Sequence, residues 1–254
     1  MKVLVFCLLA GISSLSFAFD HDHKKWDQVL SKYLDHQAFV KYKTLKEDIK
    51  DGQHPFNHYL ADLSAVSEAS YNKWNRTEKM AFLINSYNAF TVKLILDNYP
   101  VDSIRDIGGL FTKPWSLKFF TLLGKKMSLD PIEHEILRPV FKDYRIHAAV
   151  NCASISCPVL AKKAFTSSNL DALLDEQMSL WLNDSSRNKV SPDGNWELSK
   201  IFDWYEDDFV NWGGGVDKVV RKYHKDAKGY QTKKLDIDHL KYDWNLNEAK
   251  KGAS

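Results

Sequence analysis

The sequence predicts an α+β fold in which a small antiparallel sheet is packed by several helices. Helical periodicity dominates the first hundred residues, and short alternating segments bounded by turn residues are interspersed with helices after that. Hydrophobic residues make up 44% of the 254 residues, while glycine (11) and proline (7) are few, so the composition favours a packed globule over disorder. We find no internal repeat and no linker.

The first 18 residues have the pattern of a secretory signal. Lys2 supplies a positive start, Val3 to Ser16 is mostly apolar but too short to cross a bilayer, and Ser16 and Ala18 are small residues of the kind that a signal peptidase reads. We therefore expect a signal peptide over 1–18 and a single exported domain, periplasmic or secreted, over 19–254. No later stretch predicts a transmembrane segment.

The first half of the mature chain predicts helices. Residues 26–49 have helical spacing, and the strongest helix starts at Asn75, where Asn75 and Glu78 form a capping-box pattern, and ends near 98–100. Asn85 and Asn88 lie on apolar faces of this helix. Because a buried amide without partners costs about 1–3 kcal/mol, we expect them either to bind loop backbone or to orient a histidine in an active site.

The middle of the chain predicts a short helix over 101–107 with Asp102 as its cap, and a hairpin of 119–123 with 126–129. The run Asp130-Pro-Ile-Glu133 has a cap, a proline and a glutamate at the positions that start a helix. Its spacing puts His134 and Arg138 on one face, with Pro139 ending or bending the helix.

The second half predicts alternating helices and strands. The expected elements are a strand over 145–150, a helix from its cap Ser168 to Leu182, a hairpin over 189–198, helices over 202–210 and 216–223 around the glycines 213–215, and an extended segment over 237–246. The aromatic motif 242–247 is expected to be a terminal strand with a structural role, and a ligand groove is the alternative.

The most informative segment is the loop that follows residues 145–150 and contains Cys152 and Cys157. These are the two cysteines that remain after removal of the signal, since Cys7 lies within it. They indicate either a thiol nucleophile or a structural disulfide, which an exported protein would retain.

Several segments together resemble a known family. They are Phe82-Leu-Ile-Asn-Ser-Tyr-Asn-Ala89, Ser103-Ile-Arg-Asp-Ile107, the run 128–138 with its Ile-Glu-His motif, the run 145–158 with both cysteines, and Tyr242-Asp-Trp-Asn-Leu-Asn247. Taken in this order, the segments are similar to the family of unknown function called DUF547. The similarity covers most of the mature chain. Bacterial members of that family resemble exported proteins. Plant members resemble this chain at Cys152 and at the Ile-Glu-His motif but carry serine in place of Cys157, which implies a role for Cys152 and His134.

A thiol enzyme can be assembled from these residues. Cys152 would be the nucleophile and His134 its base, with Asn85 or Asn88 holding the imidazole and the amides around Ala153 and Ser154 receiving an oxyanion. This is the logic of papain-like hydrolases, with histidine before cysteine as in permuted versions of that arrangement.

Other residues of this set have competing interpretations. His147 is a rival base, although a structural histidine is the more frequent outcome, and Arg138 binds either a substrate carboxylate or Glu135. Cys152, Cys157, His134 and His147 would supply zinc ligands, but the cysteine spacing exceeds the usual one, so we expect no metal and no cofactor.

Three functions therefore fit the sequence. The first is a cysteine-dependent hydrolase or acyl transferase acting on an amide or peptide-like substrate. The second is a non-catalytic envelope module that binds a partner protein or peptide and contains a Cys152–Cys157 disulfide, and the third is a small-molecule binding protein. Charge is balanced, with 35 basic and 33 acidic residues, and no basic stripe indicates nucleic acid as a partner. The oligomeric state does not follow from the sequence.

Overall fold

A computed structural model describes residues 18–109, 112–230 and 235–250. The expected signal peptide therefore lies outside the described residues, apart from Ala18. Within the described ranges, no helix combines the length and the apolar character that crossing a bilayer needs.

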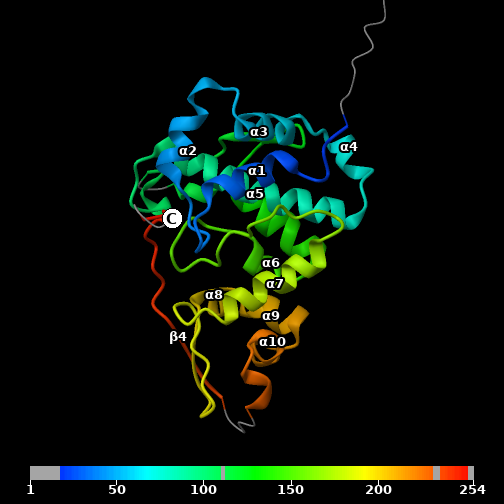
Figure 1. The fold of residues 1–254 in the computed structure, drawn as a ribbon. Helices are drawn as coiled ribbons and strands as arrows, with labels where there is room; N and C mark the ends of the chain where they lie inside the picture. The colour runs from blue at the N-terminus through cyan, green and yellow to red at the C-terminus, as the bar shows by residue number, and fades with distance from the viewer. Residues whose placement is uncertain (1–17, 110–111, 231–234, 251–254) are drawn as a thin grey trace, which may run out of the picture.

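The first half of the described chain is helical, as predicted (Figure 1). The long helix α5 begins with the predicted capping box, because the Asn75 side chain accepts a hydrogen bond from the Glu78 amide at 2.8 Å and the Glu78 carboxylate accepts one from the Asn75 amide at 2.8 Å. The elements of this half are α1 (Lys24–Tyr33), α2 (Tyr42–Asp48), η1 (Ile49–Asp51), α3 (Pro55–Ala65), α4 (Glu68–Asn72) and α5 (Arg76–Asn98).

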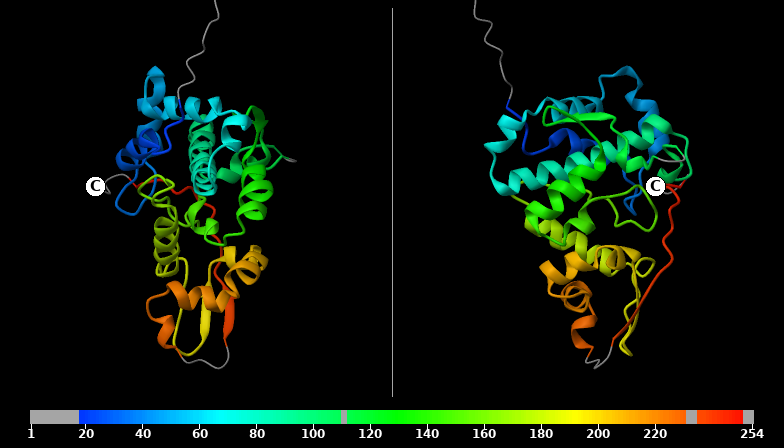
Figure 2. Two further views of the ribbon diagram at one scale, coloured as in Figure 1. Left: turned by 90° about the vertical axis from the view of Figure 1, so that its right-hand side faces the viewer. Right: turned by 180° about the vertical axis from the view of Figure 1, so that it is seen from behind.

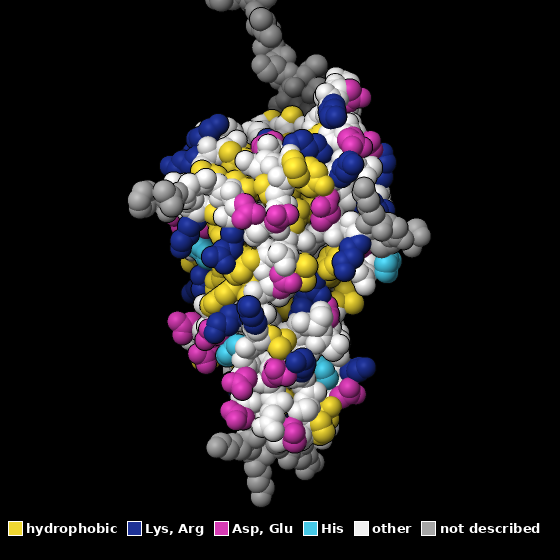
Figure 3. All heavy atoms as spheres, turned by 90° about the vertical axis from the view of Figure 1, so that its left-hand side faces the viewer, with side chains coloured by type: hydrophobic (Ala, Val, Ile, Leu, Met, Phe, Trp, Pro, Cys, Tyr) yellow, Lys and Arg dark blue, Asp and Glu magenta, His cyan; other side chains and the backbone are white. Residues whose placement is uncertain are grey.

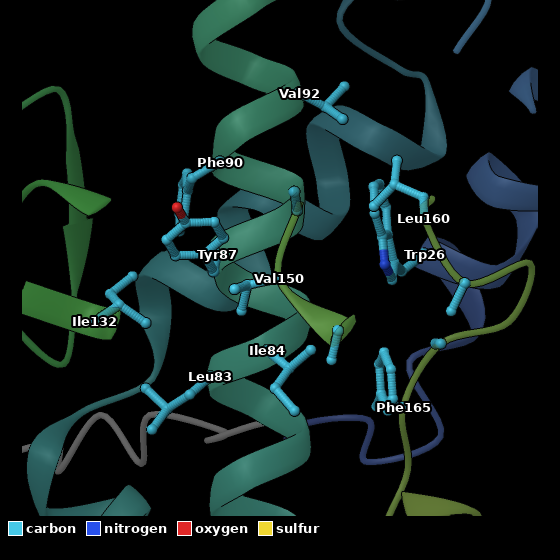
Figure 4. Close-up of a cluster of buried hydrophobic side chains, with 14 of the residues drawn as sticks. Trp26, Leu83, Ile84, Tyr87, Phe90, Val92, Ile132, Val150, Leu160 and Phe165 are labelled. Carbon is cyan, nitrogen blue, oxygen red and sulfur yellow. The ribbon is translucent and has the colours of Figure 1, made fainter. Parts of the chain in front are cut away.

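Helix α5 is the centre of the main hydrophobic core, and most of its side chains are buried. Figure 4 shows Tyr87 near Ile132 on one side of the helix, Leu160 and Phe165 on the other, and Val150 in front of it. Burial on several faces explains why this helix is apolar nearly all round.

The antiparallel hairpin consists of β1 (Phe120–Leu122) and β2 (Lys125–Met127), with Phe120 opposite Met127. Its turn contains Gly124, whose φ of 74° favours glycine, and lies one residue earlier than predicted. The helix expected over 101–107 is reduced to the 3₁₀ turn η2 (Ile104–Asp106). The cap is Ser103, whose hydroxyl accepts from the Arg105 amide, so the predicted cap Asp102 is wrong. A second 3₁₀ turn, η3 (Pro114–Ser116), precedes the hairpin.

The helix predicted from Asp130 is the π-helix η4 (Pro131–Phe141), and it continues two residues past Pro139 instead of ending there. The strand predicted over 145–150 is wrong. Residues Ile146–Ala149 form the short helix α6, whose four side chains are all buried. Ala148 and Ala149 are strong helix formers, and over so few residues an apolar run does not distinguish a strand from a buried helix.

The second half builds the narrow end of the molecule (Figures 1 and 2). Strands β3 and β4 pair in parallel, and only a single bridge between Lys189 and Glu197 remains of the predicted hairpin over 189–198. Ser168 does not cap the next helix, because Asn169 occupies the cap position without a side-chain bond. The elements here are α7 (Leu170–Leu182), β3 (Asn195–Leu198), α8 (Lys200–Trp204), α9 (Glu206–Gly213), α10 (Val216–Tyr223), η5 (Ala227–Gly229) and β4 (Asp236–His239).

Two clusters of buried side chains divide the described core. The first surrounds α5, and the second, which includes Trp181, Phe202 and Phe209, fills the narrow end. After β4 the chain runs back to the broad end, as both views of Figure 2 show, and there Leu246 donates to the carbonyl of Asp102 at 2.7 Å. The predicted α+β class, with a small antiparallel sheet packed by helices, is confirmed. Figure 3 shows acidic and basic side chains interspersed on one face, in agreement with the balanced composition.

Candidate functional site

A cavity of about 1020 Å³ lies where the two buried clusters meet. Its wall combines residues of η4, α6 and α8 with the cysteine loop (residues 150–158) and the C-terminal segment after β4. The lining includes Tyr87, Arg105, Lys113, Trp115, Glu133, His134, His147, Cys152, Cys157, Trp204, Tyr205, Tyr242 and Trp244.

Asn88 fixes the start of the cysteine loop. Its side-chain nitrogen donates to the carbonyl of Ala149 at 2.9 Å, and its oxygen accepts from the amide of Asn151 at 2.8 Å. Asn151 in turn accepts from the amide of Ala153 at 2.8 Å and donates to the carbonyl of Pro158 at 2.7 Å. Ala153 adopts a left-handed φ of 57°, so these bonds hold the loop in a tight and uncommon conformation.

Asn85 has the same kind of role one turn earlier on α5. It donates to the carbonyl of Phe165 at 2.7 Å and accepts from the amide of the same residue at 3.1 Å. Asn85 and Asn88 are both buried and both bind loop backbone, which is the first of the roles we expected for them. Neither side chain contacts His134.

Replacing Asn88 by alanine is expected to lower the free energy of unfolding by about 2–5 kcal/mol, because the carbonyl of Ala149 and the amide of Asn151 would each lose a buried partner. Urea denaturation measures this loss. Asn98, exposed near the end of the same helix, is the matched control, and its alanine variant should change stability by less than about 0.5 kcal/mol. Equal losses in both variants would contradict the assigned role.

The rest of the loop is held by Arg187 and by the C-terminal segment. The buried Arg187 donates from Nε to the carbonyl of Cys157 at 2.8 Å and from Nη2 to that of Ile155 at 2.7 Å. Ile155 donates to the carbonyl of Asn245 at 2.9 Å, so the C-terminal segment lies along the loop. This pairing brings Tyr242 to the thiols.

The thiols of Cys152 and Cys157 are free, with their Sγ atoms 2.9 Å apart. Cys157 is buried, whereas Cys152 is partly exposed. The Ser154 hydroxyl and the Tyr242 hydroxyl each lie 3.1 Å from Cys152 Sγ, and the Cys152 amide donates to Cys157 Sγ at 3.0 Å. The Cys152 sulfur is therefore surrounded by groups that can donate to a thiolate.

These contacts give the two thiols opposite acidities. Burial raises the pKa of Cys152, but the hydrogen bonds from Cys157, Ser154 and Tyr242 outweigh it, so the pKa lies below that of an ordinary thiol. Burial, together with the neighbouring Cys152, raises the pKa of Cys157 well above the ordinary value. Burial also raises the pKa of Tyr242, which keeps this phenol a donor. Cys152 is the thiol that ionises first.

His147 is held by a buried carboxylate. Its Nε2 lies 2.8 Å from Asp208 Oδ2, and Arg138 contacts the same carboxylate through Nε at 2.6 Å and Nη2 at 3.0 Å. Burial raises the pKa of Asp208, but the bonds from His147 and Arg138 outweigh it and the net shift is downward. Because an ionised carboxylate only accepts, Nε2 of His147 carries the proton of this contact.

His134 lines the same cavity but is exposed, and its Nδ1 lies 3.2 Å from Nη1 of Arg138. Arginine only donates, so this nitrogen acts as an acceptor. In the part of the chain that the structure describes, no histidine nitrogen lies within hydrogen-bonding distance of either sulfur. The expected contact between His134 and Cys152 is absent.

Two further expectations need correction. Arg138 of η4 pairs with Asp208 of α9 and not with Glu135. The amide of Ala153 is not free to bind an oxyanion, since Asn151 accepts from it. The hydroxyls of Ser154 and Tyr242 are donors that lie beside the sulfur.

Sequence reasoning did not assign a functional role to Asp208, Tyr205 or Glu133. Tyr205 stacks against His147, with ring centroids 4.2 Å apart, and its pKa is raised by burial and by the charge of Glu133. The sequence signal for Glu133 is its place in the Ile-Glu-His motif, although the same place also fits a helix-start residue. Among the described residues, no cluster of three or more histidine, cysteine or acidic side chains has the arrangement of a metal site.

Comparison with known proteins gives one result. Residues 71–182 match a family described as Protein of unknown function, DUF547, and this stretch contains α5, η4, α6, the cysteine loop and α7. Searches among curated proteins and among solved structures gave no significant match. Within residues 71–182, the chain is therefore similar to the DUF547 family.

Proposed function

We propose that the protein is a cysteine-dependent hydrolase or acyl transferase acting on an amide or peptide-like substrate, with Cys152 as its nucleophile. The observation that carries this proposal is the environment of Cys152 Sγ, which lines a large cavity and contacts three hydrogen-bonding groups that lower its pKa. A thiolate is the reactive form of cysteine, and reactive cysteines occupy partly exposed sites of lowered pKa.

The reaction follows from the groups around the sulfur. The Cys152 thiolate attacks the substrate carbonyl carbon, a C–S bond forms, and the carbonyl electron pair moves to oxygen. The hydroxyls of Ser154 and Tyr242 are close enough to Sγ to donate to that oxygen. Collapse of the intermediate breaks the bond to the leaving group, which takes a proton, and leaves a thioester. Water or an acceptor amine then attacks the thioester, and the thiolate leaves.

His147 is the proton carrier of this scheme. Asp208 fixes its orientation through Nε2, which leaves Nδ1 to deliver a proton to the leaving group and to remove one from the attacking nucleophile. Because His147 forms no hydrogen bond with the Cys152 sulfur, the thiol proton must reach His147 through cavity water or the substrate. His134 is exposed at the same cavity and engaged by Arg138, so we assign it a role in binding and not that of base.

Acylation by p-nitrophenyl acetate tests this function. We expect a rapid burst of nitrophenol, a mass increase of one acetyl group on the intact protein, and location of that group on Cys152 after peptide mapping. Acetylation confined to surface lysines, or absent, would contradict the proposal.

The alternative function is a non-catalytic binding module with a Cys152–Cys157 disulfide, and the 2.9 Å between the sulfurs is the observation that favours it. Titration of thiols in protein purified from the exported fraction separates the two. Two titratable thiols support the enzyme, whereas none, together with no acetylation, supports the module.

We also propose that the protein is exported, because residues 1–18 have the pattern of a secretory signal. We expect the mature protein to begin at Phe19, to include residues 19–254 as one domain, and to lie in the periplasm or the medium. Amino-terminal sequencing of the protein from each cell fraction checks this. A cytoplasmic protein that still begins at Met1 would contradict it.

A further inference from the structure

The cavity contains a carboxylate with no cation paired to it. Glu133 lies in the first turn of η4 and is only 6% exposed, yet its side chain lines the cavity. No lysine or arginine among the described residues forms a salt bridge with it. The guanidinium of Arg138, one turn later on the same helix, is used by Asp208 and His134. Tyr205 gives Glu133 a neutral hydrogen bond, and Arg138 acts on its charge without forming a salt bridge with it. Because acidic side chains are almost never this buried unless they are paired, the position lacks a cation in direct contact with Glu133.

Three aromatic side chains form a wall of the same cavity. Trp204, Tyr242 and Trp244 are in mutual contact, with ring centroids 4.5–5.7 Å apart, and all three line the cavity. The faces of such rings attract cations, and Arg105 already shows this on Trp244, with its guanidinium 5.3 Å from the ring centroid. A ligand with an apolar body and a positive end would satisfy both the wall and the carboxylate.

We propose that the cavity binds a substrate that carries a protonated primary amine, with the ammonium at Glu133 and the apolar part against Trp204, Tyr242 and Trp244. That the bound amine is a substrate, and not only a ligand, rests on the proposed function. It names the class of substrate that the thiol would meet, such as the amino terminus or lysine side chain of a peptide-like molecule.

Binding of the ammonium also affects the thiol. The charge of Glu133 acts to raise the pKa of Cys152, against the three hydrogen bonds that lower it. An ammonium bound at Glu133 neutralises that charge, so the thiolate becomes easier to form when the substrate is present. By linkage, ionisation of Cys152 strengthens amine binding by the same factor.

Calorimetry with phenethylammonium tests the subsite, with the neutral 3-phenylpropan-1-ol and the anionic 3-phenylpropionate as analogues of similar shape. We expect the ammonium to bind at least about tenfold more tightly than either analogue. Glu133→Gln should abolish this preference while leaving the binding of the alcohol unchanged. Glu176→Gln removes the same charge at an exposed position on α7, outside the cavity lining, and should leave all three affinities within about twofold. Equal affinity of the wild type for the three compounds would overturn the proposal without any need for a variant.

The Cys152→Ser protein distinguishes failure of the subsite from failure of the proposed function. If phenethylammonium binds this protein selectively but the wild type is never acetylated, the subsite stands and the enzyme does not. If the wild type is acetylated on Cys152 but selects no ammonium, the thiol chemistry stands and the amine subsite is wrong. A third readout is the rate of iodoacetamide reaction at Cys152 near neutral pH, which should rise several-fold on addition of phenethylammonium in the wild type and not in Glu133→Gln.

Discussion

Replacing Cys152 by serine is expected to lower the rate of acylation by about 10⁴-fold or more, since no other described thiol has both a lowered pKa and access to the cavity. Serine keeps the shape of the side chain but ionises far less readily, and no described histidine lies close enough to activate it. The rate of nitrophenol release and the mass of the protein after incubation with p-nitrophenyl acetate measure the effect.

Cys157→Ala is the matched variant for this prediction. It removes the thiol that lies 2.9 Å from Cys152 Sγ and can donate a hydrogen bond to the Cys152 thiolate, but it keeps the nucleophile. Because a hydrogen bond to a charged group contributes about 1.5–3 kcal/mol, we expect acylation near neutral pH to slow by about 10- to 100-fold and to recover at alkaline pH. If Cys157→Ala were as inactive as Cys152→Ser at every pH, the thiols would have to act as a pair, and the assignment of a single nucleophile would be wrong.

Replacing Asp208 by asparagine is expected to reduce acylation by about 10²- to 10⁴-fold and to destabilise the fold by about 2–4 kcal/mol at neutral pH. Asp208 is 4% exposed and accepts hydrogen bonds from His147 and from two nitrogens of Arg138. An amide in its place provides one oxygen acceptor, leaves Arg138 without its counter-ion and permits the wrong tautomer of His147. Kinetics and urea denaturation measure the two effects.

The pH dependence of stability gives a second readout for Asp208. Its pKa is lower in the folded protein than in the unfolded chain, so its contribution is fully present above the unfolded value and is lost as pH falls through the folded value. The wild type should therefore lose stability in acid faster than Asp208→Asn does. Asp207→Asn is the matched control, because Asp207 is the exposed neighbour on the same helix and its variant should follow the wild type. Parallel acid profiles for all three proteins would contradict this role of Asp208.

Features that depend on neighbours in sequence were predictable. The capping box of Asn75 and Glu78 fixes the start of α5 through bonds three residues apart, and α10 has the predicted bounds. The interpretation of Asn85 and Asn88 also rested on a local rule, because an amide on an apolar helix face must find partners. The rule indicated that they would bind something polar, and the structure shows that this is the backbone at Phe165, Ala149 and Asn151.

Features that depend on distant segments were not predictable from one sequence. His147 and Asp208 are 61 positions apart, and Cys152 and Tyr242 are 90 apart, so nothing in the local pattern joins them. The same limit applies to β3, whose partner β4 lies beyond α10 and pairs in parallel where a local hairpin was expected. The residue types at the cavity were visible in the sequence, but their pairing was decided by tertiary contacts.

The pH dependence of alkylation at the two thiols of the wild-type protein tests the central claim most directly. Limited reaction with iodoacetamide between pH 5 and 10, followed by peptide mapping, gives a separate profile for Cys152 and for Cys157. The surroundings of the sulfurs predict that Cys152 reacts first, with a midpoint below the ordinary thiol pKa of about 8.5, and that Cys157 stays unmodified over most of the range. Equal profiles for both thiols, or a midpoint for Cys152 above that of an ordinary thiol, would contradict a nucleophile at this position.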